Sequence, residues 1–83
     1  MARLNVTFSG HNGDYPDEVN YDSTDAEIRQ IATESVQTGY IPGIPASPDA
    51  DFADFVVDRF PATEELPARI MLRPKTPFGR PDA

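Results

Sequence analysis

The fold is decided by residues 23–39, which read STDAEIRQIATESVQTG. Thr24 and Glu27 have the spacing of a capping box, in which each side chain accepts a hydrogen bond from the other residue's backbone amide. Gly39 suits the position just after a helix, because glycine adopts a left-handed backbone without strain. One face of the segment is apolar at helical spacing, through Ile28, Ile31, Ala32, Ser35 and Val36. We therefore predict an amphipathic helix over residues 25–38, with this face against a sheet.

The residues before this helix predict two strands. Residues 4–9 alternate between apolar and polar side chains, which is the pattern of a strand with one buried face. Residues 18–22 alternate in the same way. Between them, residues 10–14 (GHNGD) are typical of a turn. We expect the two strands to pair as an antiparallel hairpin with a long loop.

The residues after the helix begin with a connector that contains two prolines. Residues 40–45 (YIPGIP) exclude a helix and a central strand, because proline donates no backbone hydrogen bond. We expect this connector to cross the base of the domain, with Ile41 or Ile44 in the core. Residues 47–51 (SPDAD) predict the start of a helix of one or two turns, with Ser47 as its cap.

Two further strands are predicted over residues 55–60 and 68–73, which are rich in β-branched, aromatic and aliphatic side chains. Ile70 and Leu72 are expected to point inward, because two arginines flank this segment. Phe52 and Phe55 are expected to lie in the core, because a small domain needs its aromatic side chains inside.

The order of these elements is strand, strand, helix, connector, strand, strand. One helix must cover one face of the sheet, because neither surface can bury itself alone. The first and last strands are the most apolar, so we expect them to lie side by side and parallel at the centre. The prediction is an α+β fold of the β-grasp layout, a mixed four-stranded sheet packed on one helix. The domain spans residues 1–73, and three prolines make residues 74–83 a flexible tail.

Four segments also resemble those of a known family. Residues 4–10 (LNVTFSG) are similar to the opening strand of ubiquitin, and residues 23–28 (STDAEI) to the start of its helix. Residues 44–49 (IPASPD) are similar to the proline-bearing link after that helix, and residues 69–73 (RIMLR) to the basic last strand. In this order, the segments make the chain resemble the ubiquitin-like family, including bacterial ubiquitin-like modifier proteins, over about residues 3–79.

The resemblance implies a protein modifier or carrier of the bacterial cytoplasm. Its partners would be activating and conjugating enzymes, which act on a C-terminal carboxylate. Such modifiers usually end in Gly-Gly, whereas this chain continues past Gly79 as Arg80-Pro81-Asp82-Ala83. We expect a processing peptidase to cleave before Arg80, so that Gly79 becomes the reactive terminus. No lysine precedes Lys75, so the domain body offers no lysine for building chains.

A second hypothesis is a β-grasp adaptor that is not conjugated and binds a partner through its sheet face. The expected binding residues are Met71, Arg69 and Arg73, together with whichever of Val56 and Val57 faces outward. In the tail, Lys75 and Phe78 complete the predicted partner-binding set. A sulfur carrier is a third alternative, because those proteins also act through a C-terminal glycine.

Composition bounds these hypotheses. The 83 residues are enough for one small domain and carry a formal charge of −7, which repels nucleic acid and anionic membranes. No apolar run approaches the ~20 residues that a membrane span needs. The chain has no cysteine, so it has neither a disulfide nor a thiolate site.

Catalytic and metal-binding patterns are weak in this sequence. His11 is the only histidine, and no serine has a histidine placed to activate it. The acidic residues Asp49, Asp51 and Asp54 lack the glycine and glutamate of a calcium loop. We therefore predict no catalytic residue, no metal site, no cofactor and no enzyme activity in this chain.

Overall fold

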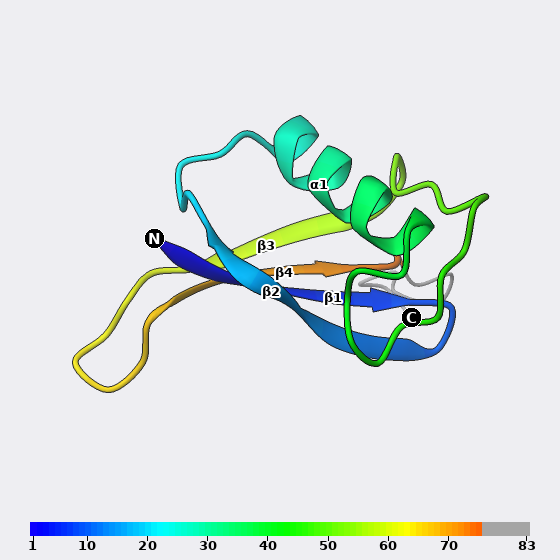
Figure 1. The fold of residues 1–83 in the computed structure, drawn as a ribbon. Helices are drawn as coiled ribbons and strands as arrows, with labels where there is room; N and C mark the ends of the chain where they lie inside the picture. Colours follow the sequence, from blue (N-terminus) through cyan, green and yellow to red (C-terminus); the bar gives the residue numbers. More distant parts are fainter. Residues whose placement is uncertain (76–83) are drawn as a thin grey trace, which may run out of the picture.

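The computed structural model describes residues 1–75. The predicted processing residues Gly79 and Arg80 and the predicted partner-binding residue Phe78 lie outside that range. Strands β1 (Ala2–Phe8), β2 (His11–Val19), β3 (Val56–Phe60) and β4 (Ala68–Arg73) form one sheet in the order β2-β1-β4-β3. The central pair β1 and β4 is parallel, and the other two pairs are antiparallel. Helix α1 (Asp25–Gln37) covers one face of this sheet (Figure 1). The predicted α+β class and mixed four-stranded sheet are confirmed, and the arrangement is consistent with a β-grasp layout.

The hairpin between β1 and β2 is tighter than the sequence suggested. Ser9 and Gly10 alone make the turn, with φ of 52° and 80°. Two consecutive residues with positive φ are typical of the two-residue turns whose twist matches that of paired strands. The predicted long loop is therefore wrong, and the turn-like residues after Gly10 belong to β2. The second strand was expected over residues 18–22, but it spans His11–Val19.

Helix α1 begins with the predicted capping box. The Thr24 backbone amide donates to Glu27 Oε1 over 2.8 Å, and the Glu27 amide donates to Thr24 Oγ1 over 3.1 Å. Gly39 follows the helix with φ of 73°. The apolar stripe is confirmed except at one position, since Ile31 is only half-buried while the other four members are buried. Ile31 thus lies at the margin of the helix–sheet contact.

The connector between α1 and β3 contains no helix, so the predicted short helix at Ser47 is wrong. The Ala50 amide donates to the Ser47 carbonyl in an isolated turn. Both Ile41 and Ile44 are buried. Phe52 is fully buried against Phe55, with ring centroids 4.6 Å apart, and the Phe55 amide donates to the Phe52 carbonyl in a second isolated turn.

Strand register divides the sheet into two faces. Leu4, Val6, Ile70 and Leu72 point toward α1, and each is at most 1% exposed. This confirms the predicted inward direction of Ile70 and Leu72. Because side chains alternate along a strand, the residues between them point away from the helix. That second face carries the candidate site.

Candidate functional site

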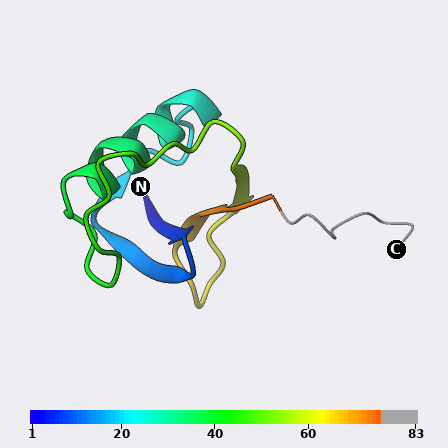
Figure 2. The same ribbon diagram turned by 90° about the vertical axis from the view of Figure 1, so that its right-hand side faces the viewer.

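The candidate site is the sheet face opposite α1, which we call the open face. In Figure 2 the helix and the connector lie on the other side of the sheet. Pairing register assigns to this face alternate residues of β1, β3 and β4, together with their Cα partners on β2. Its members are Arg3, Asn5 and Thr7 of β1, Asn12, Asp14 and Glu18 of β2, Val56, Asp58 and Phe60 of β3, and Arg69, Met71 and Arg73 of β4.

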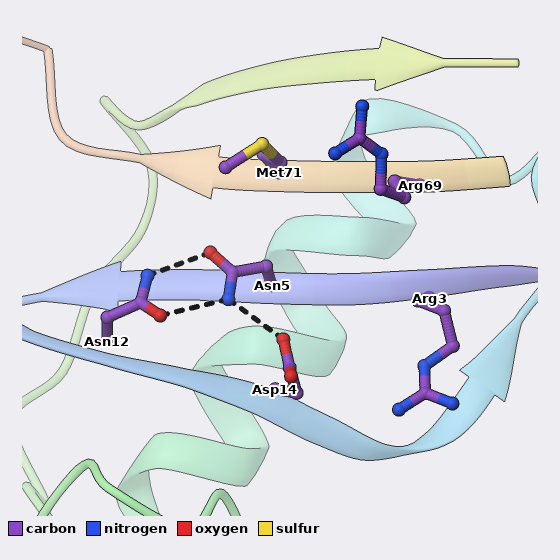
Figure 3. Close-up of a pocket in the computed structure, with 6 residues that line it drawn as sticks. All are labelled: Arg3, Asn5, Asn12, Asp14, Arg69 and Met71. Carbon is purple, nitrogen blue, oxygen red and sulfur yellow. Dashed lines mark hydrogen bonds between the residues drawn. The ribbon is translucent and has the colours of Figure 1, made fainter. Parts of the chain in front are cut away.

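A shallow groove of about 350 Å³ lies on the open face between β2 and β4 (Figure 3). Its floor is a polar network. The amides of Asn5 and Asn12 donate to each other's side-chain oxygen over 3.0 and 2.8 Å, and Asn5 also donates to Asp14 over 2.8 Å. These hydrogen bonds join the side chains of β1 and β2 across the floor of the groove. Met71 and the two arginines Arg3 and Arg69 complete its lining.

The three arginines of the open face differ in their partners. Arg73 is paired with Asp58, with 2.6 Å between Nε and Oδ2. Arg69 lies over the ring of Phe60, with its guanidinium carbon 4.9 Å from the ring centroid. Within residues 1–75, neither Arg69 nor Arg3 has a carboxylate within ion-pair distance. Two cations of this face are therefore available to an incoming anion.

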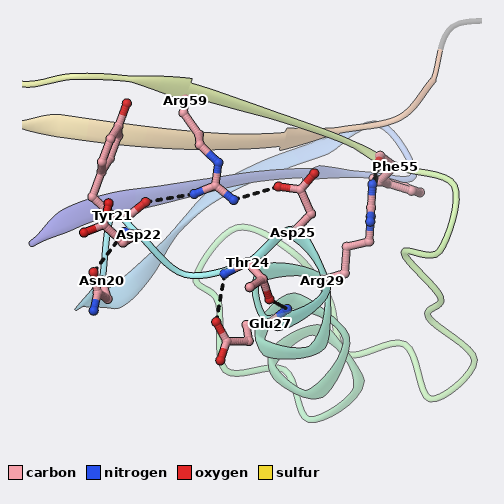
Figure 4. A network of polar contacts seen from close by, with 9 residues as sticks. All are labelled: Asn20, Tyr21, Asp22, Thr24, Asp25, Glu27, Arg29, Phe55 and Arg59. Atoms are coloured by element: carbon pink, nitrogen blue, oxygen red, sulfur yellow. Dashed lines mark hydrogen bonds and ion pairs between the residues drawn. The ribbon is translucent and has the colours of Figure 1, made fainter.

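Two further arginines are structural and lie on the helix side of the sheet (Figure 4). Arg29 of α1 donates from Nε and one terminal nitrogen to the Phe55 carbonyl, over 3.2 and 2.9 Å. Arg59 of β3 donates to the Tyr21 carbonyl over 2.8 Å and pairs with Asp25 over 2.7 Å. Both guanidinium groups tie α1 and its flanking loops to β3.

This chain matches no protein-family model, no curated protein and no solved structure.

The predicted partner-binding residues separate into three groups. Arg69, Met71 and Arg73 lie together on the open face, and Val56 is the outward member of its pair because it lies opposite Arg73. Lys75 lines a different cleft, beside Asp25 and Arg29 at the helix side of β3. Phe78, Gly79 and Arg80 lie outside the described residues.

Sequence reasoning missed Arg3 and Phe60 as members of the site. Arg3 is the Cα partner of Arg69 across the parallel pair, and Phe60 is its partner across the antiparallel pair. The alternation in residues 4–9, continued back to Arg3, indicates that Arg3 points outward. It does not give the pairing register, which brings three strands distant in sequence together.

The described part of the chain contains no cluster of three histidine, cysteine or acidic side chains that would hold a metal ion. His11 is exposed at the start of β2. Asp51 accepts a hydrogen bond from the Ala53 amide, as residues in tight turns do. No helix among residues 1–75 is long and apolar enough to cross a membrane.

Among the titratable groups of residues 1–75, Tyr40 has a shifted pKa. The Tyr40 hydroxyl donates to Asp17 Oδ2 over 2.8 Å, and this hydrogen bond, with the negative charge of Asp17, raises the pKa of Tyr40 above 10.0. The ring of Tyr15 lies edge-on to that of Tyr40, 5.6 Å away. The pair lies at the end of α1, away from the open face, and it links the connector to β2.

Proposed function

We propose that this protein is a binding protein that recognises a protein partner through the open face of its sheet. The observation that carries this proposal is the composition of that face. It presents Met71 and Phe60 among three arginines, with no described element over them. Aromatic residues, methionine and arginine are the residue types enriched in protein interfaces.

The rigidity of the face supports the same function. A four-stranded sheet holds outward side chains at fixed spacings, and hydrogen bonds among Asn5, Asn12 and Asp14 fix the groove floor. Binding of a partner then costs less free energy, because the side chains of this surface are already ordered. Met71 is half-buried at the centre of the face, where a flexible thioether adapts to the shape of a partner.

Site-specific photocrosslinking in the native cell tests this proposal. A photoreactive phenylalanine analogue replaces Met71 in one variant and Gln30, which is exposed on α1, in a control variant. We expect one discrete adduct from position 71 and none from position 30. The adduct should disappear when Arg69→Glu is added. Equal labelling from both positions would contradict a function of the open face.

A second candidate, the modifier or carrier, is favoured by the position of the last strand. β4 lies at the centre of the sheet beside β1, and the sequence continues from Arg73 to Gly79. Under this candidate, a peptidase removes residues 80–83 and an activating enzyme acts on the Gly79 carboxylate. The open face would then be the surface to which activating and conjugating enzymes bind.

Mass spectrometry separates the two candidates. The protein is expressed from its own genomic neighbourhood and the mass of every form is measured. A form ending at Gly79, or an adduct through that residue, supports the modifier. A terminal thiocarboxylate on Gly79 would instead support the sulfur carrier. If every form keeps Ala83, the modifier is wrong and the adaptor remains.

A further inference from the structure

We infer that the open face binds an acidic segment of a partner protein, with carboxylates at Arg3 and Arg69 and an apolar side chain beside Phe60. This inference rests on the proposed binding function and gives the chemistry of its partner. Its first support is the distribution of charge. The open face carries three arginines and three carboxylates (Asp14, Glu18 and Asp58), but among residues 1–75 neither Arg3 nor Arg69 has a carboxylate within ion-pair distance.

The second support is that Arg3 and Arg69 lie on two sides of one groove. These residues are Cα partners on neighbouring strands, and both point outward. Arg3 is also the Cα partner of Glu18 on β2. In Figure 3 the two side chains lean apart, Arg3 toward β2 and Arg69 toward β3, and the groove lies between them. An anion in the groove can therefore receive hydrogen bonds from both guanidinium groups.

The third support is that Arg69 is already oriented. Stacking over Phe60 at 4.9 Å holds the plane of the guanidinium and leaves its edge free to donate. A planar fork of donors matches the two oxygens of a carboxylate. Lysine at this position would keep the charge and lose both the stack and the fork.

The apolar part of the partner is indicated by exposed side chains at one end of the face. Phe60, Leu66 and Met1 are 38%, 51% and 75% exposed, and they are three of the four large hydrophobic residues exposed among those described. The pairing of Ala2 with Ala68 places Met1 beside the end of the loop that carries Leu66. Figures 1 and 2 show this β3–β4 loop projecting away from the helix, so it forms a wall at this end of the open face.

A short acidic segment fits this surface better than nucleic acid does. Asp14 and Glu18 lie along β2, and Glu64 and Glu65 lie on the loop wall. A long polyanion that crossed the face would meet all of these carboxylates, whereas a short segment at Arg3, Arg69 and Phe60 would meet only Asp14 in the lining of the groove. Binding of this kind weakens as salt screens the charges.

Chemical-shift mapping on the isotopically labelled full chain tests the inference. The probe is a peptide with one leucine flanked by glutamates, and its matched control has glutamine in place of every glutamate. We expect the acidic probe to shift the amides of residues 3–5 and 69–71. Its affinity should fall about tenfold or more between about 0.05 M and about 0.5 M salt. The glutamine control should bind at least about tenfold more weakly.

Three variants locate the effect. Arg3→Gln and Arg69→Gln should each weaken the acidic probe about tenfold, while Lys75→Gln, with the same charge change on another surface, should not. Arg3→Gln should melt at nearly the same temperature as the wild type, because among residues 1–75 Arg3 makes no ion pair that the change would remove. That result separates lost binding from lost folding.

The outcomes also separate this inference from the function on which it rests. If the glutamine control shifts the same amides with equal affinity, the open face binds peptides but the acidic chemistry is wrong. If an oligothymidine binds the face more tightly than the acidic peptide, the partner class is wrong. If neither peptide shifts any amide of β1 or β4, both the inference and the proposed function are overturned.

Discussion

Replacing Gly13 with alanine should destabilise this protein more than its position in a strand suggests. Gly13 lies in β2 beneath the connector, and a Cβ added there would lie deep inside van der Waals contact with the Pro42 carbonyl oxygen. The same Cβ would lie 2.8 Å from Ile41 Cγ2, where ordinary contact begins at 3.4 Å. The backbone of Gly13 does not have the positive φ found at Gly10, so the cost of Gly13→Ala is steric.

The size of this cost follows from what the connector carries. It must withdraw from β2 by about 0.6 Å or more to restore ordinary contact at Ile41. Ile41 and Ile44 are 1% and 4% exposed, so withdrawal loosens two core side chains. Overpacking of a core costs about 1–3 kcal/mol. We expect a loss of about 3 kcal/mol, from a total of about 5 kcal/mol for a domain of this size.

Urea unfolding followed by far-ultraviolet circular dichroism measures the loss. Gly10→Ala is the matched control, since a Cβ at Gly10 meets nothing within 4 Å but must adopt a φ of 80°. That strain costs about 1 kcal/mol. If Gly13→Ala is no more destabilising than Gly10→Ala, the close packing of the connector on β2 is wrong.

Three further outcomes are expected. Thr24→Ala should lose about 1 kcal/mol of stability in the same assay, and Thr24→Ser should lose less, because serine keeps the capping hydroxyl. Ile28→Ala should cost about 2–5 kcal/mol and Ile31→Ala clearly less, because Ile28 is fully buried and Ile31 is half-buried, and equal losses would contradict this. In an ultraviolet titration, Tyr40 should ionise above pH 10.0 and Asp17→Asn should lower that pKa. The Tyr40–Asp17 hydrogen bond is therefore present at neutral pH and is lost as pH rises through the raised pKa of Tyr40. An unchanged Tyr40 titration in Asp17→Asn would show that this hydrogen bond does not raise the pKa.

The sequence predicted best those elements whose signals are local. The helix was predicted within one residue of its observed end, because the Thr24–Glu27 box and Gly39 mark its limits within its own residues. The last strand was predicted with its observed limits, Ala68–Arg73, because β4 is apolar on its inner face and basic on its outer face.

The wrong predictions of a long hairpin loop and of a short helix share one cause, which is that residues typical of a turn or a helix start make tertiary contacts instead. Gly13 was taken as part of a turn, and it is the residue that lets the connector approach β2. Ser47 and the proline after it had the pattern of a helix start, but the segment makes two isolated turns, and Phe52 is buried in the core. Neither contact is visible to a window of a few residues.

The candidate site was predictable in part for a similar reason. Arg69, Met71 and Arg73 share one strand, so alternation alone places them on one face. Phe60 and Arg3 come from strands far away in sequence, and only the pairing with β4 brings them beside Arg69. The pair of opposed arginines, on which the acidic-partner inference depends, is thus a product of the sheet register.

The adaptor and the modifier place different demands on the same face, and this makes them separable by a double-mutant cycle. Between Arg73 and Gly79 the chain spans six residues, so a terminus at Gly79 reaches at most about 20 Å beyond β4. An enzyme that acts on Gly79 can therefore bind the open face and the terminus together.

If the protein is a modifier, Arg69→Glu and deletion of residues 79–83 should each block conjugation, so combining the two changes should add nothing further. If it is an adaptor, the deletion should leave the affinity for the partner unchanged and Arg69→Glu alone should remove it. If conjugation is lost with either change and the two effects are not additive, the open face recognises the enzyme and the tail carries the reacting carboxylate.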